Sequence, residues 1–270
     1  MTDSDKDFIG SIPEVYDEYL VPLIFEHYAQ DLAERVAKIN PMSVLETAAG
    51  SGVVSRVLIK VLSPASQYIV TDLNQPMLDH AASKQAADSR ILWRQADALN
   101  LPFEAETFDV VVCQFGVMFY PDRVKSYSEA CRVLKPGGSL IFNVWDRIET
   151  NEFAEVVTAA AARVFPDDPP QFLPRTPHGY CDEDLIREEL QAAGFSSVEC
   201  ESLEAVSSAP SPHHPAIAYC QGTPLRNEIE QRDAGLLHEV TDRAAEAIAV
   251  RFGTGTVEGM MRGHVVTAVR

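Results

Sequence analysis

The stretch Val44–Gly52, which reads VLETAAGSG, decides the fold of this 270-residue chain. Two apolar residues, Val44 and Leu45, lead into the acid Glu46, and a run of small residues follows before a helical pattern begins. Small residues let a backbone approach a ligand closely, and the N–H groups at the start of a helix suit an anion. The stretch therefore predicts a strand, a ligand-binding loop and a helix in succession.

Strand-like and helix-like segments alternate outward from this stretch, from about residue 42 to residue 145. The run VVVC at 110–113 does not alternate in polarity, so we expect both of its faces to be buried, as in a central parallel strand. A helical pattern follows a predicted N-cap at Asp122 and stops at the KPGG of 135–138, and Asn74 is a second predicted N-cap. This alternation predicts an α/β fold of βαβ units. The strands are expected at residues 43–46, 68–71, 91–95, 108–114 and 139–145.

The sheet is expected to resume late in the chain. Residues 182–193 show acids in a first helical turn and a glycine just past the end, and strands are expected at 195–206 and 260–269. Two stretches, 147–181 and 207–257, fall outside this plan, and we interpret them as cap material over the carboxyl edge of the sheet, where open α/β sheets bind ligands. The predicted divisions are a helical segment or lid at 1–40, a ligand-binding core at 41–146, a cap insertion at 147–181, a core helix and strand at 182–206, a helical cap at 207–257 and the last core strand at 258–270.

The composition argues against several classes of protein. A net charge of −18 repels phosphate backbones and anionic lipid, so neither nucleic acid nor a membrane surface is an expected partner. No apolar run approaches the ~20 residues of a membrane span. Five scattered cysteines form no C-x-x-C pair, so we expect a reducing cytoplasm and neither disulfides nor a zinc site. His213 and His214 have no other ligand residues nearby, which predicts an exposed loop there and no metal.

Two further acids follow predicted strands. Asp72 ends the second strand, and its two oxygens match the vicinal hydroxyls of a ribose. Asp97 comes just after the third strand, where it can accept from an exocyclic amine such as that of adenine. The run Gly50–Ser55 also passes as a variant of the dinucleotide fingerprint, with Ser55 in place of its last glycine. A nicotinamide or flavin cofactor therefore stays open as an alternative.

Five motifs occur in the order typical of one enzyme family. They are VLETAAGSG at 44–52, TDLNQPML at 71–78, QADALNLPF at 95–103, FDVVVCQFGVMFYPD at 108–122 and RVLKPGG at 132–138. In these motifs the chain resembles class I S-adenosylmethionine-dependent methyltransferases, and most of all their ubiquinone/menaquinone-biosynthesis-like small-molecule branch. The resemblance is close over residues 43–145, and the family usually has glycine where this chain has Ala48. It implies a Rossmann-like, seven-stranded mixed sheet, with the last strand antiparallel, flanked by helices.

The resemblance also implies where the cofactor, S-adenosylmethionine, binds. It would lie across the carboxyl ends of the first four strands, with Glu46 accepting from its ammonium group and the helix that follows binding its carboxylate. The implied contacts are Glu46, Ala48, Gly50 and Gly52 for the methionine part, Asp72 and Leu73 for the ribose, Asp97 and Ala98 for the adenine, with Met77 on its face, and Gln114 near the sulfonium.

The expected function is methyl transfer to a small, aromatic or lipid-like molecule. This reaction is an in-line displacement with a neutral leaving group, so an enzyme mainly aligns donor and acceptor. The CQFG of 113–116 differs from the [D/N]-P-P-[Y/F] of DNA-base methyltransferases, and the sequence lacks the acid cluster of a catechol-type metal site. The expected acceptor pocket comprises Phe115, Met118, Phe119, Tyr120 and Trp145, with Tyr16, His178 and Tyr180 as candidates for touching or deprotonating the acceptor and with no metal.

Two other functions remain open at this stage. Cofactor binding and catalysis share Gly50, Asp72 and Asp97, so a non-catalytic, S-adenosylmethionine-binding regulatory protein fits the same residues. A nicotinamide-dependent oxidoreductase fits less well, because Asp97-Ala98 and the glycines of RVLKPGG favour the methyl donor. A homo-oligomer is compatible with the sequence.

Overall fold

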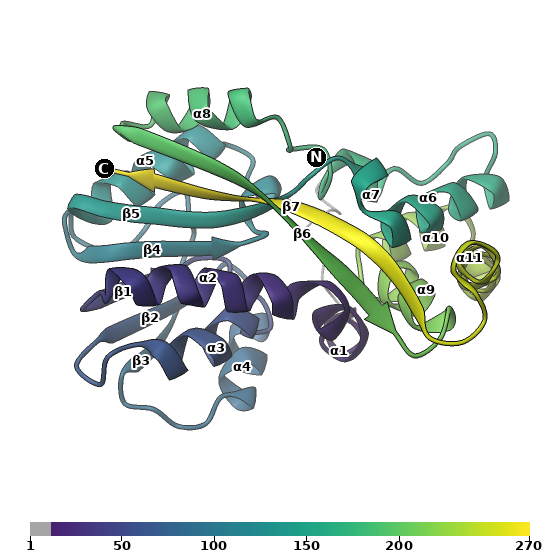
Figure 1. The fold of residues 1–270 in the computed structure, drawn as a ribbon, viewed down its shortest axis with the longest axis horizontal. Coiled ribbons are helices and arrows are strands. Elements are labelled where there is room, and N and C mark those ends of the chain that lie inside the picture. The colour runs from purple at the N-terminus through teal and green to yellow at the C-terminus, as the bar shows by residue number, and fades with distance from the viewer. Residues whose placement is uncertain (1–11) are drawn as a thin grey trace. The chain divides into compact units, whose positions relative to one another are not determined.

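A mixed β-sheet of seven strands organises the chain, for which a computed structural model describes residues 12–270 (Figure 1). The strand order is β3-β2-β1-β4-β5-β7-β6. The Arg270 N–H donates to the Gly138 carbonyl and the Asp146 N–H to the Arg262 carbonyl, so β7 runs antiparallel to β5. The predicted Rossmann-like mixed sheet with an antiparallel last strand is confirmed. The strands are β1 Ser43–Glu46, β2 Gln67–Asp72, β3 Ile91–Gln95, β4 Phe108–Gln114, β5 Leu134–Trp145, β6 Ser197–Ala209 and β7 Val257–Val269.

The chain divides into two units. The sheet unit comprises residues Glu26–Val144, Cys181–Ser202 and His264–Arg270, and the helical unit comprises residues 12–25, Trp145–Tyr180 and Leu203–Gly263. Residues 1–11, the first part of the helical segment predicted at 1–40, lie outside the described residues. The helices are α1 Ile12–Val15, α2 Glu26–Ile39, α3 Val53–Val61, α4 Gln75–Lys84, α5 Arg123–Val133, α6 Glu152–Val164, α7 Phe172–Arg175, α8 Glu183–Ala192, α9 His213–Gln221, α10 Leu225–Asp233 and α11 Leu237–Phe252, with a π-helical segment at Tyr16–Phe25.

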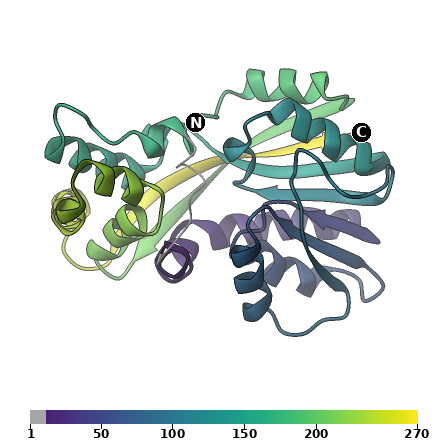
Figure 2. The same cartoon turned by 180° about the vertical axis from the view of Figure 1, so that it is seen from behind.

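The centre of the sheet is fully buried, as its sequence predicts. β2, β1, β4 and β5 are parallel neighbours, and residues 110–113 of β4 are at most 1% exposed. Ser55 of α3 reaches one face of the sheet, where it bonds Glu46, and Tyr127 of α5 stacks on Phe142 of β5 on the opposite face. Figures 1 and 2, which view the chain from opposite sides, show α2 along one face of the sheet and α5 along the other.

The predicted helix ends are largely confirmed. The Asp122 side chain caps α5 by accepting from the Lys125 N–H, and Asp182 caps α8, which ends before Gly194 at a φ of 103°. Asn74 occupies the N-cap of α4, but its side chain makes no capping hydrogen bond, and its backbone N–H donates to the Asp72 carboxylate.

Two expectations need correction. β5 begins at Leu134 rather than at residue 139, because Leu134 already pairs with Phe108 before the KPGG segment interrupts the register. His213 and His214 begin α9 instead of forming a loop. The His214 ring packs on Tyr19, with ring centroids 4.9 Å apart, and its Nε2 lies 3.1 Å from the Tyr19 carbonyl oxygen, so this histidine has a packing role.

The helical unit has its own core. α6 and α9 both pack on α11, which buries the predicted apolar stripe of Val240, Ala244 and Ile248. The buried Glu228 carboxylate accepts from two backbone N–H groups at the start of α7 and pairs with Arg175. In the part of the chain that the structure describes, no helix is both long enough and apolar enough to cross a membrane.

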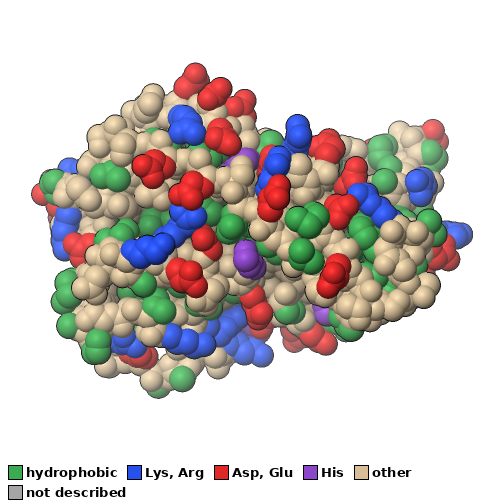
Figure 3. All heavy atoms as spheres, in the orientation of Figure 1, with side chains coloured by type: hydrophobic (Ala, Val, Ile, Leu, Met, Phe, Trp, Pro, Cys, Tyr) green, Lys and Arg blue, Asp and Glu red, His purple; other side chains and the backbone are tan. Residues whose placement is uncertain are grey.

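Acidic side chains are spread over the surface among basic ones, as the face in Figure 3 shows. Several are paired locally. In the sheet unit, Arg35 donates to both oxygens of Glu201, and in the helical unit, Arg251 pairs with Glu152 and Glu155. These ion pairs offset part of the repulsion among the 40 acidic side chains, and the net charge of −18 remains unpaired.

Asp109 joins the amino ends of β1 and β4. Its Oδ2 accepts from the N–H groups of Met42 and Ser43 and from the Ser43 hydroxyl, each at 2.9 Å, and its Oδ1 lies 2.7 Å from the Lys135 Nζ. Desolvation opposes ionisation, but the bonds from Lys135 and Ser43 outweigh it and hold the pKa of Asp109 below its ordinary value. The carboxylate therefore stabilises the fold only while it is ionised.

We expect Asp109→Ala to lower the free energy of unfolding at pH 7 by about 2–3 kcal/mol, the scale of hydrogen bonds to a charged group. The loss in Asp109→Asn should be smaller, because an amide oxygen still accepts. A depressed pKa means that the wild type keeps this stability above about pH 4, the pKa of an unfolded aspartate, and loses it as the pH falls through the lower pKa of the folded state. The difference in unfolding free energy between wild type and Asp109→Ala should therefore narrow below about pH 4. Urea denaturation at pH 7 and at about pH 3 measures this, with exposed Glu104→Ala as the control, and a difference that is the same at both pH values contradicts the assignment.

Candidate functional site

The parallel register gathers polar residues at the carboxyl edge of the sheet. Glu46 ends β1, Asp72 ends β2, Gln114 ends β4 and Asn143 lies near the end of β5. Glu46 pairs with Val70 of β2 and with Val112 of β4, which lie two residues before Asp72 and Gln114 on their strands. Gln114 pairs with Asn143 of β5. Side chains two residues apart along a strand share a face, so all four belong to the same face of the sheet.

Glu46 is a buried acid that accepts hydrogen bonds through only one of its two carboxylate oxygens. Its Oε2 accepts from the Ser55 hydroxyl at 2.7 Å and from the Tyr68 hydroxyl, while its Oε1 accepts from no residue between 12 and 270. Burial raises the pKa of Glu46 to about 7, and the two hydroxyl donors oppose that rise. A cation placed beside Oε1 would favour the ionised form.

The Asp72 carboxylate connects two loops. Its Oδ2 accepts from the Gly50 N–H and its Oδ1 from the Asn74 N–H, both at 2.8 Å. Burial raises the pKa of Asp72, and these backbone donors oppose the rise. The Leu73 N–H is a third backbone donor, and a carboxylate has about four acceptor sites, so Asp72 keeps some acceptor capacity for a ligand.

The loop between β1 and α3 has left-handed backbone at Ala48, Gly50 and Gly52, with φ values of 52°, 57° and 80°. A Cβ at Gly52 would lie 2.9 Å from the Ala81 Cβ, so this glycine lets α3 and α4 pack closely. A Cβ at Gly50 would meet nothing within 4 Å. No side chain caps the start of α3, so its first N–H groups have no side-chain acceptor.

Ala48 lies where the family usually has glycine, and its methyl group has a specific partner. A Cβ on Gly116 would come within 2.7 Å of both the Ala48 Cβ and the Cys113 Sγ. The bare backbone of Gly116 therefore makes room for the extra methyl of Ala48. Beside them, the Tyr120 hydroxyl lies 3.5 Å from the Cys113 Sγ and donates to the Thr47 hydroxyl at 3.4 Å.

Part of the expected acceptor pocket gathers after β4. Phe115 and Met118 are buried, and Phe115 has left-handed backbone with a φ of 49°. Its ring meets the edge of Tyr28 from α2 at a centroid distance of 5.0 Å. Tyr120 belongs to the same segment, and its hydroxyl faces the loop after β1.

Comparison with known families decides the class of this site. The model of the ubiE/COQ5 methyltransferase family matches residues 11–210, about three quarters of the chain. The chain belongs to the ubiE/COQ5 methyltransferase family. It is an S-adenosylmethionine-dependent methyltransferase, and its acceptor is a small molecule. The match takes in every strand except β7, and it ends before α9.

Individual relatives are distant. A demethylmenaquinone methyltransferase of Clavibacter sepedonicus is 26% identical over 185 residues, which are 63% of this chain and 72% of the relative. Among solved structures, a phosphoethanolamine N-methyltransferase of Haemonchus contortus, in complex with S-adenosylhomocysteine, aligns with a TM-score of 0.54 at 19% identity, covering 97% of this chain and 61% of that one. The [4+2]-cyclase SpnF aligns with a TM-score of 0.58 at 17% identity over 90% and 80%. These structures share the fold.

The residues expected at the adenine and ribose lie around the ends of β2 and β3. Asp97 is exposed just after β3, and its Oδ1 accepts from the Leu99 N–H at 2.9 Å. Leu73 is 57% exposed, Met77 is buried in α4, and Ala98 is half-buried. The methyltransferase therefore presents Asp97 and Leu73 to solvent at neighbouring strand ends.

The candidates for contacting the acceptor lie in the helical unit. Tyr16 stacks on Phe25, Phe25 packs on Trp145, and Trp145 packs on His178, with centroid distances of 5.2, 6.0 and 6.1 Å. Tyr180 is 3% exposed. Four of the aromatic rings thus form one continuous row.

His178 is held as a neutral imidazole. Its Nδ1 lies 2.8 Å from the Asp146 carbonyl oxygen, which can only accept, so Nδ1 carries the proton. Burial lowers the pKa of His178 to about 4, and the bond to Asp146 opposes that fall. At neutral pH this histidine is a hydrogen-bonding group and a weak base.

Sequence reasoning missed several polar residues of this methyltransferase. Neither amide atom of Asn143, a fully buried residue, has a hydrogen-bond partner among residues 12–270. The signal that was overlooked is a polar residue, Asn143, inside the otherwise apolar run LIFNVW. Tyr68 and Ser55 carried no signal, because only the packed sheet brings their hydroxyls to Glu46.

We expect Gly116→Ala to lower the free energy of unfolding by about 1–3 kcal/mol, the usual cost of overpacking. Ala48→Gly alone should change stability by less than about 1 kcal/mol, because relief of the left-handed backbone offsets the added freedom of the unfolded chain. In the double variant, Ala48→Gly should recover part of the loss, since it removes one of the two close contacts. Urea denaturation of all four proteins measures the coupling, and strictly additive effects would rule out the contact.

Proposed function

We propose that the carboxyl edge of β2, β1 and β4 binds S-adenosylmethionine through the residues that the family motifs supply. The observation that carries this proposal is the buried carboxylate of Glu46, whose Oε1 accepts no hydrogen bond from residues 12–270. An ammonium group suits such an oxygen, because an adjacent cation offsets the cost of burying the ionised carboxylate. The methionine part of the cofactor carries that group.

The loop after β1 fits the rest of the methionine part. The uncapped start of α3 suits its carboxylate, and the open space beside Gly50 leaves room for a ligand against the backbone. The proposed contacts here are Glu46, Ala48 and Gly50, whereas Gly52 acts through the packing of α3 on α4.

The ribose and adenine contacts follow from the neighbouring strand ends. Asp72 accepts from the backbone N–H groups of Gly50, Asn74 and Leu73, and its remaining acceptor capacity suits a ribose hydroxyl. Asp97 accepts from the adenine amine and the Ala98 backbone borders the ring, with Met77 behind it. Gln114, at the end of β4, lies nearest to the reacting centre.

The bound cofactor supplies a methyl group on a sulfonium, which leaves as a neutral thioether. The residues of this chain then have three tasks: to hold the donor, to align the acceptor with it and to exclude water. Glu46 and Asp72 perform the first task. The buried side chains after β4, Phe115 and Met118, provide an apolar wall for the second and third tasks.

We propose that the acceptor is an aromatic, quinol-like molecule with an apolar substituent. Relatives named for demethylmenaquinone methylation support this class, as do the apolar residues Phe115 and Met118. We assign acceptor recognition also to the helical unit, whose aromatic row includes Tyr16, Trp145 and His178. All five cysteines are free, which supports a reducing compartment such as the cytoplasm.

The cofactor assignment predicts a pH-dependent affinity. Binding of S-adenosylhomocysteine, which carries the same ammonium, should tighten by up to about tenfold per pH unit from pH 6 to pH 7, because Glu46 must lose its proton to accept the cation. Glu46→Gln should bind more weakly at pH 8 by about 1.5–3 kcal/mol and should lose the pH dependence. Titration calorimetry at three pH values measures both effects.

Two controls keep this experiment interpretable. Asp79→Asn, an exposed acid on α4, should bind like the wild type. Because the pKa of Glu46 is raised, the ligand-free wild type loses stability as the pH rises between about 4.5 and 7, and Glu46→Gln should not. Unchanged affinity in a folded Glu46→Gln protein would show that another group receives the ammonium.

The acceptor assignment predicts ring methylation of a reduced naphthoquinone that carries a short isoprenoid tail. With S-adenosylmethionine as donor, mass spectrometry should detect one added methyl on the ring, and Phe115→Ala should raise the KM for the quinol by roughly tenfold, the effect of about 1.4 kcal/mol of lost contact. Phosphomonomethylethanolamine serves as the contrasting acceptor. Methylation of the amine without methylation of the quinol would overturn the proposed substrate class while leaving the cofactor site intact.

A further inference from the structure

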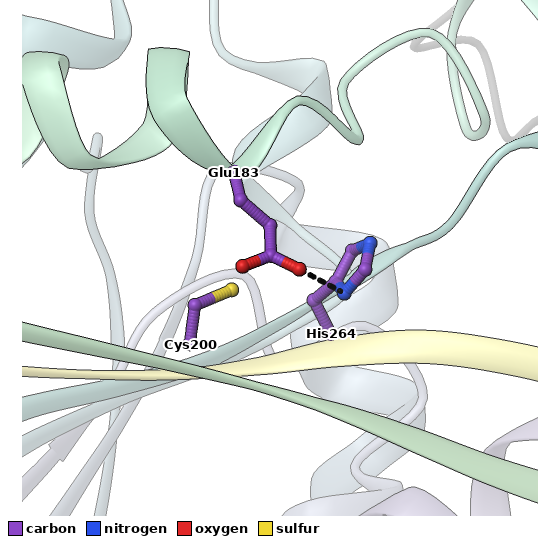
Figure 4. Close-up of side chains that lie close together, drawn as sticks. All are labelled: Glu183, Cys200 and His264. Atoms are coloured by element: carbon purple, nitrogen blue, oxygen red, sulfur yellow. Dashed lines mark ion pairs between the residues drawn. The ribbon is translucent and has the colours of Figure 1, made fainter.

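A second cluster of reactive side chains lies in the sheet unit, apart from the residues assigned to the cofactor. Glu183 comes from the first turn of α8, Cys200 from β6 and His264 from β7. Figure 4 shows the three side chains directed toward one another. No family motif includes any of them.

The distances within this cluster are those of a metal site. The three donor atoms, a carboxylate oxygen, the Cys200 Sγ and a His264 ring nitrogen, all lie within 4.8 Å of one another. The His264 Nδ1 and the Glu183 Oε1 are 3.6 Å apart. A tetrahedral ion with bonds of about 2.0–2.3 Å holds its ligand atoms roughly 3.3–3.8 Å apart. The oxygen and nitrogen already have this spacing, and the sulfur lies within 4.8 Å of both.

The surroundings of Glu183 direct one of its oxygens into the cluster. Arg187, one turn later on α8, donates to the Glu183 Oε2 at 3.1 Å and to the Val198 carbonyl at 3.0 Å. The other oxygen, Oε1, faces His264. Partners of this kind, which hold a ligand side chain in place from outside, are typical of metal sites.

The donor set indicates which ion would fit. One thiol, one imidazole and one carboxylate form a borderline-soft set, which suits zinc far better than magnesium or calcium. Three protein ligands leave a fourth position for water. The Ser202 hydroxyl lies 3.1 Å from the His264 Nδ1, so it must turn away from this nitrogen when the ion binds, and it is then close enough to bond that water.

A nucleophilic role for Cys200 does not fit the same geometry. Without a cation, burial and then Glu183 raise the pKa of this thiol to about 12, so it stays protonated at neutral pH. A reactive cysteine needs neighbours that stabilise the thiolate, whereas this one has a carboxylate beside it.

We propose that Glu183, Cys200 and His264 bind a zinc ion, with water in the fourth position. On binding, the Cys200 thiol gives its proton to solvent and the thiolate sulfur coordinates the ion. The ion joins α8, β6 and β7, and each ligand lies within three residues of a point where the chain passes between the two units. Its role is therefore to fasten these three segments, independently of methyl transfer.

The test is a titration of the metal-free, full-length protein with Co²⁺, followed by Zn²⁺. We expect one Co²⁺ per chain, with the charge-transfer absorption of a thiolate ligand, displacement of Co²⁺ by Zn²⁺, and a higher melting temperature with Zn²⁺. Cys200→Ser should abolish the absorption. Glu183→Gln should weaken Zn²⁺ binding at least about tenfold to 100-fold, the loss seen even for partners outside the ligand set. Cys181→Ser, the matched control, should behave like the wild type.

Metal-free variants must melt near the metal-free wild type and still bind S-adenosylhomocysteine, which establishes that they are folded. Should Cys200→Ser not fold, the half-exposed Glu183→Gln and the Cys181→Ser control decide the question by Zn²⁺ affinity alone. Absence of thiolate absorption in the wild type, or equal Zn²⁺ affinity in wild type and Glu183→Gln, would overturn the site.

Discussion

The hydrogen bond from the Gly50 N–H to the Asp72 carboxylate is the contact on which the candidate site depends. It closes the loop after β1 onto the end of β2, and it holds a backbone that takes left-handed conformations at Ala48, Gly50 and Gly52. The same carboxylate fixes the start of α4 through Asn74. The buried Asp72 carboxylate needs hydrogen-bond donors, and the left-handed loop after β1 needs a contact that holds its backbone in place. The hydrogen bond between them meets both needs.

The two ends of β1 are held by acids with different tasks. Asp109 at the amino end accepts three hydrogen bonds and pairs with Lys135, which makes it a group of the scaffold. At the carboxyl end, Glu46 accepts hydrogen bonds through one oxygen only, and burial raises its pKa. The two acids thus have different surroundings at the ends of a strand of only four residues.

The family match ends at residue 210, before α9, α10 and α11. These helices belong to the helical unit, which also contains the row of Tyr16, Phe25, Trp145 and His178. A fold alone does not decide the acceptor, which depends on the side chains that a site presents. The zinc site that we propose joins segments of the sheet unit and leaves the donor site unchanged.

The sequence by itself determined the α/β class, the buried central strand at 110–113, the cap at Asp122, the helix that ends before Gly194 and the positions of the acids at strand ends, because periodicity, capping and strand termination are local properties. Only the tertiary structure decided which hydroxyls bond Glu46, why Gly116 must be bare beside Ala48, and that Glu183, Cys200 and His264 meet. Such contacts join segments far apart in the chain, and a contact between distant segments leaves no periodic signal in either one. The wrong predictions at His213 and at the start of β5 have the same cause, because His214 packs on Tyr19 and Leu134 pairs with Phe108.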